Sequence, residues 1–260
     1  MTSERIERAV ALLVVARRER KTMTNLPEDL RPRDEEEAYA MQDALCARLG
    51  IQATAWKIAC TTDHAQAALN TDFPFRGPLP ASAVYHSPAR IPAENHFMRM
   101  VEGEFAFTLA EDLPADEGPF TRDQVAAALG TLHPAIEVAD SRFEVWRAAG
   151  KPSLIADLAV SGALVVGEGL ADWRSLDIAS LMARMEVDGE LVGEGPGSEA
   201  LGHPVEAVLW LANHLSAWGL GLKTGQIVTT GTCTGNHMTA KGSTARATFE
   251  DLGAAEASFT

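Results

Sequence analysis

The 260-residue sequence has few cysteines and no apolar run long enough to span a bilayer. Its three cysteines, Cys46, Cys60 and Cys233, have neither CxxC spacing nor the even count of a disulfide framework. We therefore expect a reducing, cytoplasmic location. The apolar segment Ala9 to Ala16 is short and leads into arginines, so it indicates an amphipathic helix and neither a signal peptide nor a membrane span.

Positive charge is also scarce, because 22 Lys and Arg residues face 36 Asp and Glu residues, which gives a formal net charge of -14. Such a chain repels phosphate backbones, and no basic cluster offsets this, so we expect no nucleic-acid partner. The same charge does not favour anionic substrates. If the substrate is a carboxylate, a metal or local cations must hold it.

The remaining composition is that of an ordinary globular chain, with 46% hydrophobic and 22% charged residues and no internal repeat. A chain of this length can bury a core without staples. We expect an N-terminal helical region with the first core strand over residues 1–70 and a β-rich catalytic core over 71–260, together forming one structural unit.

Helix signals dominate the first part of the chain and strand signals the part after residue 80. Ser3 is a candidate cap for a helix over 4–20, and Asp34 for a second helix that stops at Gly50. Further helices are expected at 63–69, 121–129 and 204–215. Strands are expected at 53–60, 98–109, 132–140, 161–169, 226–231 and 243–253, with an Asp188-Gly189 hairpin. The expected fold class is mostly β with peripheral helices (α+β).

Three glutamates in apolar, strand-like segments form the most informative group. Glu102 and Glu104 alternate with apolar residues and project from one face of the strand, where they repel each other unless a cation or protons lie between them. A solvated strand face is the alternative. Glu137 stands in the apolar run "HPAIEVAD", where an isolated charge is costly. An oxygen-rich site without a histidine pair suits Mg²⁺ or Mn²⁺ better than zinc.

Lys57 lies between Trp56 and Ile58 in the segment "TAWKIAC". A lysine in such surroundings either extends to the surface or is enclosed with a lowered pKa, the state in which lysine acts as a base.

Two further features are weaker. Cys60 and His64 have the spacing of one helical turn, but no acyl-transfer signature surrounds them, and a buried structural thiol is favoured. The segment "GTCTG" at 231–235 can present backbone N–H groups to an anion.

Taken together and in order, several segments resemble the 2-keto-4-pentenoate hydratase branch of the fumarylacetoacetate hydrolase superfamily. They are "EEAYAMQDALCARL", "WKIACTT", "GPLP", "VEGEFAF", "IEVADSRF", "IADLAVSGALVVG", "GEGPGSEALGHPVEAVLWLANHL" and "TGQIVTTGTCTG". The resemblance covers nearly the whole chain. It implies a distorted β-barrel surrounded by helices, a homo-oligomer, and a small 2-oxo acid as substrate.

The resemblance also implies roles for individual residues. Glu102, Glu104 and Glu137 are the expected ligands of a divalent Mg²⁺ or Mn²⁺ ion, which chelates the substrate and stabilises an enolate. Lys57 is the expected catalytic lysine. Hydration then ketonises a 2-hydroxy-2,4-dienoate and adds water to the conjugated enone, giving a 4-hydroxy-2-oxo acid. The residues expected to complete the substrate-binding site are Ser161, Gly231 and Thr232.

Two segments depart from the hydratase pattern. The chain reads Phe75-Arg76-Gly77-Pro78-Leu79 where many hydratases have an acid, and Asp157-Leu158-Ala159-Val160 where they often have D-N-A-S. An acid near Lys57 is thus missing unless another, such as Asp72 or Glu168, reaches the pocket. Arg76 is a candidate to bind a second substrate carboxylate, the alternative being a surface side chain. Besides a hydratase, a decarboxylase or C–C hydrolase of a 2-oxo acid and a non-catalytic relative remain open.

Overall fold

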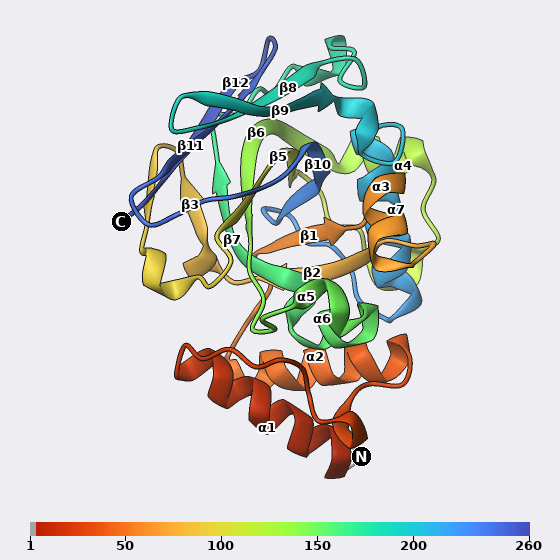
Figure 1. The fold of residues 1–260 in the computed structure, drawn as a ribbon. Coiled ribbons are helices and arrows are strands. Elements are labelled where there is room, and N and C mark those ends of the chain that lie inside the picture. The colour runs from red at the N-terminus through yellow and green to blue at the C-terminus, as the bar shows by residue number, and fades with distance from the viewer. Residues whose placement is uncertain (1–3) are drawn as a thin grey trace.

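In the computed structural model, which describes residues 4–260, two mixed β-sheets form the centre and helices lie around them (Figure 1). The larger sheet has the strand order β2 (Phe75–Leu79), β1 (Ala55–Ala59), β10 (Ile227–Met238), β5 (Met100–Leu109), β6 (Leu129–Ala139), β7 (Ser161–Val166) and β3 (Val84–His86). The smaller sheet has the order β4 (Ala89–Ile91), β12 (Gly253–Phe259), β11 (Thr244–Phe249), β8 (Met182–Val187) and β9 (Glu190–Pro196).

The facing sides of the two sheets bury one apolar core. Phe105 of β5 and Phe249 of β11 meet across it edge to face, with ring centroids 4.9 Å apart. Such aromatic pairs contribute about 0.5–1.5 kcal/mol beyond the area that they bury. This core fixes the position of β5, which carries two of the three glutamates.

The helices are peripheral, as the sequence predicts. They are α1 (Glu4–Arg18), α2 (Glu35–Leu49), α3 (Asp63–Leu69), α4 (Arg122–Ala128), α5 (Trp146–Ala149), α6 (Lys151–Ala156) and α7 (Pro204–Ala217). The Asp34 side chain accepts a hydrogen bond from the Glu37 N–H, and Gly50 ends α2 in the left-handed conformation, so both predicted caps are confirmed. The predicted Ser3 cap lies outside the described residues.

The predicted strands are present, but β10 continues past the predicted end at Gly231 to Met238, and β2, β3, β4 and β12 were not predicted. The hairpin of β8 and β9 turns at Asp188-Gly189. Strand β1 is hydrogen-bonded to both β2 and β10, so the N-terminal part of the chain contributes a strand to the larger sheet. Among residues 4–260, no helix is long and apolar enough to cross a bilayer.

Candidate active site

Strand register brings the three glutamates together. Glu102 of β5 pairs directly with Glu137 of β6, and Glu104 lies two residues further along the same face of β5. One carboxylate oxygen from each of the three lies within 4.8 Å of the others. Like charges opposite each other on a sheet are destabilising. This arrangement therefore requires compensation by a cation or by bound protons.

Burial makes the repulsion stronger. Glu104 and Glu137 are 0% and 1% exposed. Burial, followed by the charges of Glu137 and Glu102, raises the pKa of Glu104 well above its ordinary value. Burial and the charge of Glu137 raise the pKa of Glu102 to about 8. The cluster binds protons readily for the same reason that it would bind a cation: three carboxylates share one poorly solvated place.

The residues present fit a divalent metal ion. Glu104 Oε1 and Glu137 Oε2 are buried and accept no hydrogen bond from any residue between 4 and 260. Buried carboxylate oxygens are normally satisfied, so these two leave coordination capacity directed at a cation. A set of carboxylate oxygens without nitrogen or sulfur is the kind of donor set that Mg²⁺ and Mn²⁺ prefer.

Lys57 is enclosed beside these carboxylates. It is 4% exposed, and its Nζ lies 2.9 Å from Glu137 Oε1, so the surface-directed alternative is wrong. Burial alone would lower its pKa, but Glu137, Glu102 and Glu104 outweigh that effect, and the pKa is raised. The predicted lowering of the Lys57 pKa is therefore not found in this structure. Lys57 therefore carries its proton next to the cluster.

Gly231 supports the cluster from strand β10. Its N–H donates a 2.8 Å hydrogen bond to Glu104 Oε2, so this amide positions a glutamate instead of remaining free for a substrate anion. Its φ is +98°, and a Cβ there would lie 1.8 Å from Thr61 Oγ1. Only glycine fits both restrictions.

A cavity of about 110 Å³ opens in front of the cluster. Lys57, Glu102 and Thr232, three of the predicted site residues, line it. The sequence analysis missed several other lining residues: Thr61, Asn236, Trp146 and Arg147. Asn236 pairs with Glu102 through strand register, which the sequence alone does not contain, and Trp146 and Arg147 approach from the short helix α5.

Arg76 does not line this cavity within the described part of the chain. It is 1% exposed; its Nη1 donates to Gln42 Oε1 at 3.0 Å, and its guanidinium lies 4.4 Å from the Tyr39 ring centroid. Phe75, one position earlier on β2, does line the cavity, and adjacent strand residues point to opposite faces. The prediction that Arg76 binds a second substrate carboxylate is therefore wrong. The alternative prediction, a surface side chain, is wrong as well.

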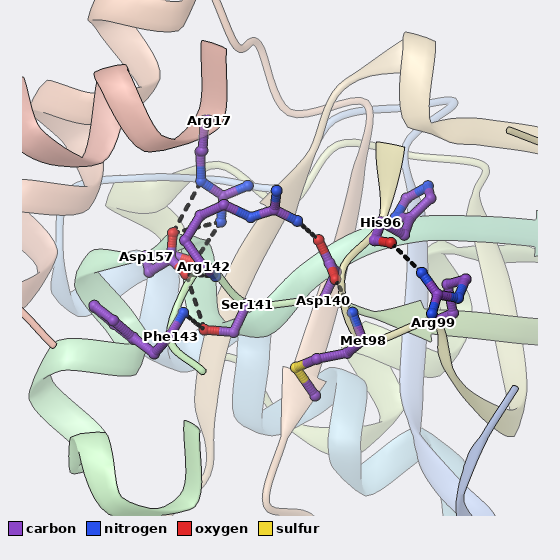
Figure 2. Close-up of polar contacts among 9 residues, drawn as sticks. All are labelled: Arg17, His96, Met98, Arg99, Asp140, Ser141, Arg142, Phe143 and Asp157. Atoms are coloured by element: carbon purple, nitrogen blue, oxygen red, sulfur yellow. Dashed lines mark hydrogen bonds and ion pairs between the residues drawn. The ribbon is translucent and has the colours of Figure 1, made fainter. Parts of the chain in front are cut away.

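Ser161 lies in a separate, polar cavity with Arg17, His96 and Arg142. A network of buried charges runs beside it (Figure 2). Asp157 accepts hydrogen bonds from Arg17 Nε at 2.9 Å, Ser141 Oγ at 3.0 Å and the Arg142 N–H at 2.7 Å. Asp140 pairs with Arg142 and accepts from the Met98 N–H. The structure thus places Ser161 outside the cavity that contains Lys57.

Two further predictions concern an acid near Lys57 and the pair Cys60 and His64. Neither Asp72 nor Glu168 lines the Lys57 cavity in the part of the chain described here, so the acid that they were considered for is not supplied there. Cys60 and His64 do line it. Burial raises the pKa of the Cys60 thiol to about 11, so it stays protonated at neutral pH and is a poor nucleophile.

Comparison with known proteins agrees with this fold. The family model for the C-terminal part of fumarylacetoacetate (FAA) hydrolase matches residues 56–260, and the chain belongs to this family. A 2-hydroxyhexa-2,4-dienoate hydratase of Comamonas testosteroni is 35% identical over 78% of this chain and 77% of its own length. A 2-keto-4-pentenoate hydratase of Paraburkholderia phymatum is 33% identical over 98% of both chains.

Solved structures share the fold over all or most of the chain. The 4-oxalocrotonate decarboxylase from Pseudomonas putida G7, complexed with magnesium and adipate, aligns with a TM-score of 0.91 at 25% identity, covering 100% of this chain and 99% of that one. A fumarylpyruvate hydrolase from Pseudomonas aeruginosa, in complex with Mn²⁺ and pyruvate, has a TM-score of 0.63 at 16% identity, over 81% of this chain and 90% of that one. The β core with peripheral helices predicted from the sequence is thus confirmed.

Proposed function

We propose that this protein is a divalent-metal-dependent hydratase that adds water to a 2-hydroxy-2,4-dienoate and forms a 4-hydroxy-2-oxo acid. The observation that carries the proposal is the group of three buried glutamates beside Lys57, with carboxylate oxygens left for a cation. Hydratases that are 30–36% identical support the reaction type.

Glu102, Glu104 and Glu137 would hold the metal ion, either Mg²⁺ or Mn²⁺. When bound, the cation supplies a Lewis acid that draws negative charge from the substrate's oxygens. It also answers the electrostatic problem set by the sequence, since an acidic chain with an acidic pocket needs a cation to hold a carboxylate substrate. Lys57 and Thr232, which line the same cavity, would contact the substrate beside the cation.

Lys57 would move the proton. Ketonisation transfers the enol proton to the far end of the diene, and hydration then places the hydroxyl and the proton of water across the remaining double bond. A lysine near the reacting atoms can donate the proton that the far carbon receives and recover one from the enol hydroxyl. It can then relay the proton of the attacking water to the carbon next to the carbonyl group, so that it ends the turnover protonated as it began. Such general acid and base catalysis contributes roughly 10²–10⁴ in rate. Phe75 and Trp146 contribute apolar surface to the same cavity.

The direct test is turnover of 2-hydroxypenta-2,4-dienoate with Mg²⁺. Loss of the conjugated dienol absorbance, with a product heavier by one water, supports the hydratase. A second candidate is decarboxylation of a 2-oxo acid, favoured by the whole-chain match to a decarboxylase and by the lack of a further acid in the cavity among residues 4–260. Release of CO₂ without hydration would select that reaction.

We also propose that the protein acts on its small-molecule substrate as a homo-oligomer in the cytoplasm, without a nucleic-acid or membrane partner. The acidic composition supports the lack of a nucleic-acid partner, and the free cysteines suit a reducing compartment. Sedimentation of the purified protein would measure the assembly.

A further inference from the structure

A second cation lies at the rim of the cavity. Arg147 of α5 lines the cavity and is exposed. Lys57, the lysine that lines the same cavity, is buried. The Arg147 guanidinium lies over the Trp146 ring at 4.3 Å from its centroid. Its hydrogen bond to Asn236 Oδ1 is long, at 3.4 Å, and no carboxylate in residues 4–260 forms an ion pair with it. A basic side chain without a carboxylate partner is unusual in a chain with a net charge of -14.

Strand register places this cation close to the glutamates. Asn236, which Arg147 contacts, pairs directly with Glu102 across β10 and β5. Directly paired strand residues have Cβ atoms about 4.5–5.5 Å apart. The guanidinium therefore contacts a residue that is paired with one of the proposed metal ligands. A short dienoate can bridge the distance between them.

Part of the cavity lining is apolar. Ala65, Ala68 and Leu69 of α3 and Phe75 of β2 line it. A hydrocarbon chain suits such a wall, and a negative group beyond that chain would reach Arg147. The surroundings thus match a ligand that has polar groups at both ends and carbon between them.

The segment that carries Arg147 is anchored. Asp157 accepts hydrogen bonds from Ser141 and from the Arg142 N–H, which fixes the chain shortly before α5 begins at Trp146 (Figure 2). The stacking of Arg147 on Trp146 further limits its rotamers. A guanidinium held in this way loses less entropy on binding a carboxylate than a freely moving one.

We propose that Arg147 is a specificity-determining residue that binds the end of the substrate distant from the glutamates, and that the preferred substrate carries a second carboxylate there. The proposal rests on the proposed function, because it assigns the other end of the substrate to the metal site. Guanidinium and carboxylate form paired, charge-assisted hydrogen bonds, which gives the contact direction as well as charge.

Calorimetric binding in the presence of Mg²⁺ tests this contact without turnover. The ligands are 2-oxoadipate and 2-oxohexanoate, which differ only in the distal carboxylate. The protein should bind 2-oxoadipate about five- to tenfold more tightly, a modest preference because the contact is at an exposed rim. Arg147→Gln should abolish the preference by weakening only 2-oxoadipate, and Arg147→Lys should retain part of it.

A matched variant controls for net charge. Arg90 is exposed on β4, outside the cavity, and Arg90→Gln removes the same charge, so it should keep the preference. Equal affinities for the two ligands, or equal losses for both in Arg147→Gln, would overturn the proposal. Failure of both ligands to bind would contradict the proposed function and this proposal with it. A preserved preference without hydration of either 2-hydroxyhexa-2,4-dienoate or its 6-carboxylate analogue would reject only the hydratase reaction.

Discussion

Two groups of buried charge lie near the end of β6, only three residues apart in sequence, and they are treated very differently. Around Asp140 and Asp157, arginines, a serine hydroxyl and backbone N–H groups satisfy the carboxylates (Figure 2). Around Glu137, two more glutamates approach and Lys57 is the basic partner in the described structure. One group is balanced and the other carries excess negative charge.

The difference separates a structural role from a functional one. Buried charge without compensation lowers the free energy of unfolding by several kcal/mol, so a chain retains it only where it has a use. A balanced network, in contrast, is explained by the loops and helices that it connects. The predictions below test whether the two groups respond in opposite ways to the loss of one member.

Glu104→Gln should have the largest effect on activity. Removing a ligand from the cation site should lower turnover by about 10³-fold or more, since the interactions with the transition state depend on the cation. The variant without metal should be at least as stable as the original protein, because the substitution relieves repulsion with Glu102 and Glu137. Turnover assays, Mn²⁺ titration and thermal unfolding in chelator measure these outcomes.

Chelation of the original protein provides the matching control. It should abolish turnover, and added Mg²⁺ or Mn²⁺ should restore it. Full turnover after exhaustive chelation would show that the excess negative charge serves something other than a metal ion.

Lys57→Met should reduce kcat by about 10²–10⁴-fold while Mn²⁺ affinity is kept or increased. The substitution removes the proton donor and also removes a positive charge that competes with the metal for Glu137. Metal titration together with kcat and KM separates these effects. A proportional loss of metal affinity and turnover would instead mean that Lys57 only organises the glutamates.

Much of this arrangement could be predicted from the sequence, and the reason is its local character. Alternation in "VEGEFAF" places Glu102 and Glu104 on one strand face, and the caps Asp34 and Gly50 mark the second helix. The pairing of Glu102 with Glu137 is a matter of register between strands, which a single sequence does not contain. It entered only through the resemblance to a family.

The errors have the same origin. Arg76 and Phe75 are adjacent, and which of them faces the cavity depends on how β2 is placed against α2. Arg147 lies in a segment whose local pattern predicts nothing about the cavity, and the chain that precedes it is held by hydrogen bonds to the distant Asp157. Tertiary contacts decided both cases.

Asp157→Asn should act on stability instead of chemistry. Breaking a buried ion pair with Arg17 and weakening two further hydrogen bonds should lower the free energy of unfolding by about 2–4 kcal/mol. Mn²⁺ affinity should stay unchanged, and turnover of folded protein should fall by less than about tenfold. Denaturant unfolding with parallel metal titration measures both. A loss of metal binding without a loss of stability would break the distinction between the two groups of charge.

The smallest effect concerns His96, which lies next to the balanced network. Burial and the nearby charges of Arg142, Arg99 and Arg17 lower the pKa of His96 to about 4. Between pH 6.5 and 4 the unfolded chain binds a proton at this histidine and the folded protein does not, so stability is complete above pH 6.5 and falls as the pH decreases. From pH 7 to 5, His96 should lower the free energy of unfolding by about 1–2 kcal/mol.

The variant His96→Gln cannot titrate there, so its free energy of unfolding should fall by that much less over the same range. His214, whose pKa is also lowered to about 4, contributes equally to both proteins and cancels in the comparison. Parallel pH profiles for the two proteins would show instead that His96 is hydrated and has an ordinary pKa in the folded protein.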